Sequence, residues 1–127
     1  MIKINLSDVV NSIPVFNDIM KQTLTGSAAF RVARLARELD NEMKTFNESR
    51  RTLVEKYAVR DDNGELKADE NGNIQIIPEK VNECNEEFNN LLNSEIEINA
   101  NKLPNDILNE IKINPQQMMD IMMFVEE

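Results

Sequence analysis

The sequence feature that most limits the fold is the stretch from Ser27 to Ala58, which contains neither glycine nor proline. Apolar side chains recur through it at three- and four-residue steps, the period of one face of an α-helix. The stripe consists of Val32, Leu35, Leu39, Met43, Phe46, Leu53 and Tyr57. Such a helix would extend for about 45–50 Å at 1.5 Å per residue. Because a small domain cannot bury that length by itself, the helix needs a second helix beside it, and a partner molecule would cover the rest.

The second helix is predicted to start at Pro78 and to continue to about Asn93. It carries apolar residues at a spacing of three, four and three, which is typical of a narrow seam between two helices. These residues are Val81, Cys84, Phe88 and Leu91. We therefore expect residues 79–93 to pack antiparallel against the long helix.

Two Asn-Gly pairs, Asn63-Gly64 and Asn71-Gly72, separate the two helices. The second pair is flanked by alternating residues, which predicts a β-hairpin whose turn takes positive φ angles from asparagine and glycine. The acidic residues near both pairs suggest a calcium loop at first sight. Aligning Gly72 with the sixth loop position, however, puts Lys67 and Pro78 where carboxylates are required. We expect a turn and no metal.

The two ends of the chain carry shorter elements. Residues 2–6 and 95–99 alternate between polar and apolar side chains and are predicted to pair as strands. Ser7 is the expected cap of the helix that follows, in which Pro14 either causes a kink or forces a restart capped by Ser12. Ser27 is the expected cap of the long helix. Pro104 and Asn114-Pro115 each open a short helix.

Together these elements predict one domain over residues 1–127, without an internal repeat. The expected fold class is mainly α (α+β). It is a long antiparallel helical hairpin with a β-hairpin near its tip, a small strand pair of residues 2–6 with 95–99, and short C-terminal helices.

The charge is distributed unevenly. Residues 1–60 carry ten Lys and Arg against seven Asp and Glu, whereas residues 61–127 carry four against sixteen, and the whole chain has a net charge of −9. An acidic total disfavours nonspecific binding to nucleic acid. No segment approaches the length of a membrane span, and a single cysteine is typical of a reducing compartment. We expect a cytoplasmic protein with no membrane partner.

The residue types required for common reactions are missing or isolated. The chain has no histidine, so Cys84 cannot form a Cys–His nucleophile, and its place on the apolar seam suggests a small buried hydrophobe. Glu83, Glu86 and Glu87 share a helical face, but a solvated acidic face explains them without a metal. We therefore expect no enzyme, no cofactor and no catalytic or metal-binding residue.

Three arginines, Arg31, Arg34 and Arg37, recur every three residues near the start of the long helix. Guanidinium groups bind phosphate and carboxylate oxygens in pairs, so this row is a candidate anion site. The alternative is that the arginines pair with Glu38, Asp40 or the acidic second helix. Both interpretations stay open at this point.

The last predicted helix is apolar on every side, which indicates burial on more than one face. Its candidate partner-binding residues are Met118, Met119, Met122, Met123 and Phe124. Methionine suits adaptable contact surfaces, and one small core cannot cover all of these side chains. We expect the remainder to meet a second copy of the chain or another protein.

The order of these segments resembles a family of small uncharacterised proteins encoded by phages and prophages of low-GC bacteria. The resemblance rests on residues 30–39, 44–48, 53–57, 69–74, 88–92 and 95–98, and on the ending at Asn114-Pro115 and 124–127. It covers nearly the whole chain and implies a viral origin. The family supplies no activity and no site residues.

Three functions follow as expectations. The first is a non-enzymatic phage structural or assembly accessory protein that acts as a homo-oligomer, in the host cytoplasm or incorporated in the virion. The second is an inhibitor that binds a host enzyme or defence protein. The third is a sponge for a small anionic, nucleotide-like ligand held by Arg31, Arg34 and Arg37.

Overall fold

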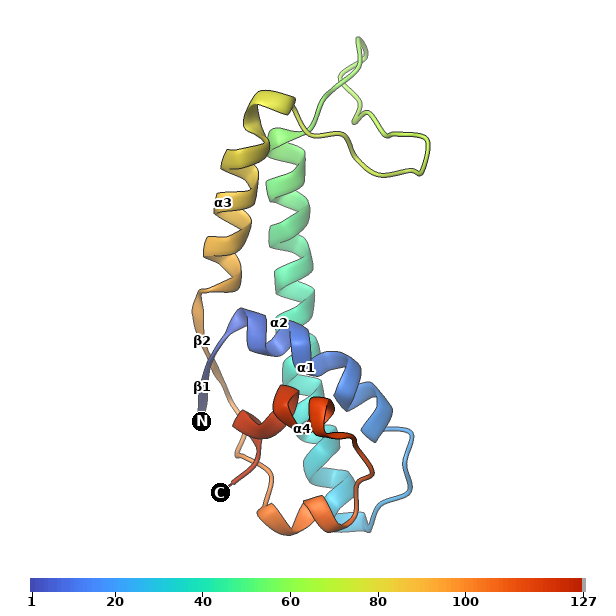
Figure 1. The fold of residues 1–127 in the computed structure, drawn as a ribbon, viewed down its shortest axis with the longest axis vertical. Coiled ribbons are helices and arrows are strands. Elements are labelled where there is room, and N and C mark those ends of the chain that lie inside the picture. Colours follow the sequence, from blue (N-terminus) through green and yellow to red (C-terminus); the bar gives the residue numbers. More distant parts are fainter. Residues whose placement is uncertain (127) are drawn as a thin grey trace. The chain divides into compact units, whose positions relative to one another are not determined.

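The computed structural model describes residues 1–126 and divides into two compact units (Figure 1). Unit 1 comprises Met1–Lys44 and the chain from Ser94 onward, and unit 2 comprises Thr45–Asn93. The long helix α2, Gly26–Tyr57, begins in unit 1 and ends in unit 2. The expectation of one domain over residues 1–127 stays a prediction.

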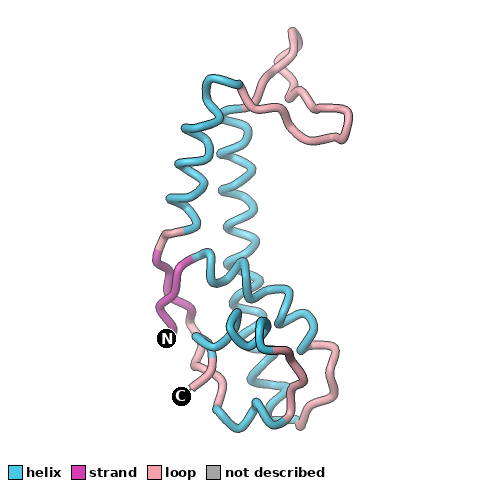
Figure 2. Tube along the Cα trace, in the orientation of Figure 1, coloured by secondary structure: helices cyan, strands magenta, loops and turns pink. Residues whose placement is uncertain are grey.

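The mainly α (α+β) class is confirmed (Figure 2). The α-helices are α1 (Leu6–Ile19), α2, α3 (Val81–Leu92) and α4 (Pro115–Ile121). Three short 3-10 helices accompany them: η1 (Pro78–Lys80), η2 (Asn105–Asn109) and η3 (Met122–Phe124).

The predicted strand pair is present in unit 1, one residue shorter in each strand. Strand β1 (Ile2–Asn5) pairs antiparallel with β2 (Glu95–Ile98), in a register that sets Ile2 opposite Ile98. Helix α1 follows directly, because the Asp8 carboxylate accepts a hydrogen bond from the Asn5 backbone N–H at 3.0 Å. The prediction of Ser7 as the cap was therefore wrong: α1 begins at Leu6, and Asn5 occupies the N-cap position.

Helix α1 continues without a break through Pro14. The alternative of a restart capped by Ser12 is wrong, because the Ser12 side chain is fully buried and its hydroxyl donates to the Val9 carbonyl at 2.9 Å. A similar correction applies to α2, which begins at Gly26 rather than after a Ser27 cap. The Thr25 hydroxyl, not that of Ser27, accepts a hydrogen bond from the Ala28 N–H at 3.4 Å.

The core of unit 1 forms where α1, α4 and the first half of α2 turn their apolar sides inward. Its most deeply buried side chains are Val9, Phe16, Ile19, Val32, Leu35, Leu39, Ile98, Leu103, Ile107, Ile121 and Phe124. The short C-terminal helices predicted after Pro104 and Asn114 are present as η2 and α4. Asn114 caps α4, since its side-chain oxygen accepts from the Gln117 N–H at 2.8 Å.

In unit 2 the second half of α2 runs antiparallel to α3, as predicted (Figure 1). The rings of Phe46 and Phe88 pack with centroids 5.9 Å apart, which places one residue of each seam in contact. Cys84 is half-buried and Val81 is exposed, so the α3 seam is covered less completely than its spacing suggests.

The connection between α2 and α3 contains the predicted pairing about Asn71-Gly72, since Ala68 and Ile74 form an antiparallel bridge, and it adds a third stretch that was not predicted. Residues 58–77, called here the triangular segment, form three short extended stretches joined by isolated bridges. Figure 2 draws this segment as a loop between the two helices. The centres of the three stretches hydrogen-bond in a closed ring: the Val59 N–H donates to Gln75, the Lys67 N–H to Val59 and the Gln75 N–H to Lys67, at 2.8–2.9 Å. The three centres are eight residues apart in sequence. The expectation of no internal repeat was therefore wrong for this segment.

The turns of the triangular segment also differ from the prediction. Gly64 and Gly72 have φ of 79° and 83°, whereas no other type of residue has a positive φ within residues 1–126. The Asp61 N–H donates to the Glu65 carbonyl, and the Gly64 N–H to the Asp61 carbonyl. This pattern is a three-residue loop with a glycine bulge rather than a two-residue turn that needs positive φ at asparagine.

Candidate binding surfaces

The three predicted arginines are exposed on α2, and none of them has an ion pair or hydrogen bond within residues 1–126. Asp40, an expected partner, instead pairs with Lys44 at 3.5 Å. The acidic face of α3 engages Lys56 through Glu87. The alternative in which the row is neutralised by these groups is therefore wrong for the described part of the chain.

The three arginines of this row do not all line the same hollow. Arg31 and Arg34 line a hollow of about 330 Å³ in unit 1, and Lys102 joins them from the loop after β2. We call this hollow the basic pocket; it is lined by Ser27, Phe30, Arg31, Arg34, Leu35, Ala100, Asn101 and Lys102. Arg37 is not among the lining residues. Sequence reasoning missed Lys102 because it lies 68 residues from Arg34 and belongs to no pattern.

The walls of the basic pocket combine an apolar floor with a polar rim. Leu35 and Ala100 are buried, whereas the Phe30 side chain is 68% exposed. Ser27 and Asn101 add a hydroxyl and an amide. The exposed ring of Phe30 lines the same pocket as the unpaired cations, so the pocket offers both a stacking surface and positive charge.

Arg31 also borders a second hollow, of about 270 Å³, together with Asp106 and Glu110. The Glu110 carboxylate accepts hydrogen bonds from the Thr25 N–H at 3.0 Å and from the Thr25 hydroxyl at 3.2 Å. Arg31 therefore lies between a positive and a negative region. Arg34 in turn borders a third hollow together with Arg37 and Glu38. Lys102 lines the basic pocket and neither of these two neighbouring hollows.

The candidate partner-binding residues of the methionine-rich ending differ in their exposure to solvent. Met119 and Met122 are 63% and 57% exposed, and Met118 and Met123 are half-buried. Phe124 is fully buried against Phe16, so its assignment as a partner-binding residue is corrected: it belongs to the core of unit 1. Met119 and Met122 together are called the methionine surface below.

Unit 2 contains a larger apolar groove, with a volume of about 760 Å³. Its apolar residues come from α2, the triangular segment and α3: Val54, Leu66, Ile74, Ile76 and Cys84. Arg50, Arg51 and Glu55 stand at its polar edge, and Arg51 pairs with Glu55 at 3.2 Å. No pattern in the sequence indicated this groove, because it depends on how residues 58–77 return to the helices of unit 2.

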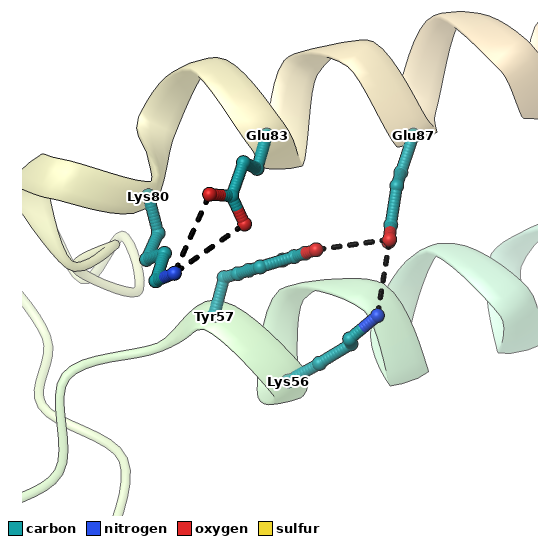
Figure 3. Close-up of polar contacts among 5 residues, drawn as sticks. All are labelled: Lys56, Tyr57, Lys80, Glu83 and Glu87. Atoms are coloured by element: carbon teal, nitrogen blue, oxygen red, sulfur yellow. Dashed lines mark hydrogen bonds and ion pairs between the residues drawn. The ribbon is translucent and has the colours of Figure 1, made fainter.

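The acidic face of α3 joins the two helices of unit 2 through Glu87 (Figure 3). One Glu87 oxygen accepts from the Lys56 ammonium at 3.0 Å and from the Tyr57 hydroxyl at 2.9 Å. These two hydrogen bonds lower the pKa of Glu87, and the one from Lys56 has the larger effect. The hydrogen bond to Glu87 is also the main reason why the pKa values of Lys56 and Tyr57 are raised. Glu83 pairs separately with Lys80 at 3.4 Å.

Within residues 1–126 no group of three His, Cys, Asp or Glu side chains is placed to hold a metal ion. The acidic turn residues have another use: Asp61 and Asp69 each accept two backbone N–H groups of their own loops at 2.9–3.0 Å. In the described part of the chain, no helix combines the length and the apolar character that crossing a membrane requires.

Comparison of the chain with protein-family models, with curated proteins and with solved structures gave no match.

Proposed function

We propose that the protein acts without catalysis, through contact with other proteins, as an oligomeric structural or assembly accessory protein. A phage origin is part of this proposal and rests on the sequence resemblance alone. The protein would act in the host cytoplasm or as a component of the virion. Its partner would be a second copy of itself or another phage or host protein.

The observation that carries this proposal is the exposure of the methionine surface on a firmly anchored helix. Ile121 and Phe124 are fully buried, while Met119 and Met122 project into solvent between and beside them. A partner that covers side chains on an already ordered helix does not have to order the backbone there, and only the side-chain rotamers are restricted. Methionine also adapts its shape to the opposing surface.

Area sets a limit on what these two side chains can do alone. Apolar burial contributes roughly 25 cal/mol per Å², and a standard interface covers about 800 Å² on each partner. Two methionines therefore supply the centre of an interface and not the whole of it. We assign them the role of its energetic centre, with surrounding polar residues of unit 1 completing the contact.

Light scattering coupled to gel filtration tests self-association at micromolar protein concentration. We expect the intact chain to run as an oligomer and the double variant Met119→Asp, Met122→Asp to run in a lower state with its helical circular dichroism retained. Met20→Asp is the matched control, because Met20 is 52% exposed in the same unit but lies at the end of α1. A monomeric intact chain would contradict the proposal.

A second candidate function is inhibition of a host enzyme or defence protein. It would also depend on apolar contact with another protein, but with a host protein as the partner. The apolar groove of unit 2 favours it, because a hollow of about 760 Å³ with an apolar floor can receive a segment of another protein. Affinity capture from host lysate with the intact chain and with the Ile74→Asp variant tests this role. We expect the variant to lose the proteins that bind through the groove. Identical capture by both would remove the groove from the proposal.

A further inference from the structure

We propose that the basic pocket of unit 1 binds a small phosphorylated molecule that carries a flat ring, of the nucleoside monophosphate class. This inference goes beyond the protein–protein role and does not depend on it. It rests on three features of the pocket: unpaired cations, an exposed aromatic ring and a limited volume.

The first feature is uncompensated positive charge. Arg31, Arg34 and Lys102 line one hollow, and none of them has an ion pair or hydrogen bond within the described residues. In a chain of net charge −9, three cations gathered without an acid among the lining residues are a local exception. Guanidinium groups grip phosphate oxygens in pairs and an ammonium adds a point charge, so a phosphate group satisfies all three.

The second feature is the ring of Phe30. It lines the same pocket as these cations and is 68% exposed, which leaves a ring face available for stacking. Bases stack favourably on aromatic side chains, as in proteins that bind single-stranded nucleic acid. A ligand with both a phosphate and a flat ring therefore uses the rim and the wall of the pocket at once.

The third feature is size. A volume of about 330 Å³ lies at the small end of ligand pockets. The hollow on the far side of Arg31 holds Asp106 and Glu110, which would repel further phosphates in that direction. Both observations favour a monophosphate over a triphosphate or a nucleic acid strand.

Isothermal titration of the intact chain with AMP at low salt tests this inference, with adenosine and inorganic phosphate as the comparison ligands. We expect AMP to bind at least tenfold more tightly than either of them. Arg34→Gln and Lys102→Gln should each weaken AMP binding about tenfold, which corresponds to about 1.4 kcal/mol. Arg31→Gln should have a smaller effect, because Arg31 also faces two carboxylates, Asp106 and Glu110. The hollow that Arg34 shares with Glu38 contains only that one carboxylate, together with a second cation, Arg37.

Arg37→Gln is the matched control, since Arg37 is also exposed on α2 but lines the neighbouring hollow with Phe30, Arg34 and Glu38 and not the basic pocket. Phe30→Ala should weaken the binding of AMP while leaving that of phosphate unchanged. The proposal is overturned if AMP does not bind, if Arg37→Gln weakens binding as much as Arg34→Gln, or if phosphate binds as tightly as AMP. Light scattering of the same samples separates this result from any change in self-association.

Discussion

The ring of Phe124 meets the ring of Phe16 edge-on in unit 1, with centroids 5.7 Å apart and planes inclined by 73°. This is a favoured geometry for two aromatic rings, because the positive edge of one faces the negative face of the other. The contact fixes η3 to α1, and neither ring is reached by solvent. An apolar residue near the end of the chain is therefore a core residue, although its neighbours Met119 and Met122 are exposed.

Phe124→Ala tests this assignment. Truncating a buried phenylalanine removes its transfer free energy and leaves a cavity, and the free energy of unfolding should fall by about 3 kcal/mol. Met122→Ala is the matched control, since an exposed side chain two residues away should change stability by less than about 0.5 kcal/mol. Urea denaturation of both variants provides the comparison. Equal losses would show that Phe124 is not the anchor.

The parts of the fold that could be predicted from the sequence are those in which apolar side chains repeat with the period of a strand or a helix. Ile2 and Ile4 alternate with polar residues and pair with β2, and the stripe of Val32, Leu35 and Leu39 is buried along α2. In these cases each residue's environment follows from the side-chain period of a strand or helix. Element ends were less accurate, because caps such as Asn5 and Thr25 depend on contacts with Asp8 and Glu110.

The parts that could not be predicted depend on residues far apart in sequence. Lys102 reaches the basic pocket only because β2 delivers the following loop to α2. Phe124 and Met122 have similar hydropathy, and only packing against Phe16 separates their roles. The arginine row was recognised from its spacing, yet which of its members line the basic pocket with Lys102 is a property of the folded chain.

The two turns of the triangular segment give a second prediction. Gly64 and Gly72 adopt φ of 79° and 83°, and a Cβ at either position would meet no atom within 4 Å. The cost of Gly64→Ala or Gly72→Ala is therefore backbone strain alone, about 1–2 kcal/mol for an L residue in this region. Gly26→Ala serves as control, since its added Cβ is equally unobstructed without positive φ. Urea denaturation showing the same change for Gly64→Ala and Gly26→Ala would contradict this explanation.

The clamp between Lys56, Tyr57 and Glu87 predicts how stability depends on pH. The pKa of Glu87 is lowered from 4.5, so its contribution is present above that value and is lost as pH falls through the lower folded pKa. The pKa values of Lys56 and Tyr57 are raised from 10.5 and 10.0, so their contributions are present below those values and are lost as pH rises. The clamp should therefore stabilise unit 2 between about pH 4.5 and 10.

Thermal unfolding of Glu87→Gln across this range checks the prediction. The variant should be less stable than the intact chain at pH 7, and the difference should shrink on acidification below about pH 4.5. Glu83→Gln is the control, because Glu83 contacts Lys80 of the adjoining η1 and does not bridge two helices. A difference that stays constant from pH 3 to 7 would exclude the Glu87 carboxylate as its source.

Pro14 gives the last prediction, because it lies inside α1 and is exposed. A proline there has no N–H for the carbonyl one turn earlier and its ring crowds that carbonyl, at a cost of roughly 3 kcal/mol. Proline also restricts the unfolded chain, which offsets about 0.4–1 kcal/mol of that cost. Pro14→Ala should therefore raise the free energy of unfolding by about 2 kcal/mol, measured by urea denaturation.

Asn11→Ala is the control, because Asn11 lies at another exposed position of α1. It gives the gain in stability from helix propensity alone, about 0.5 kcal/mol. A Pro14→Ala variant that is less stable than the intact chain would instead show that the backbone shape imposed by proline is required to seat the buried residues Val15 and Phe16.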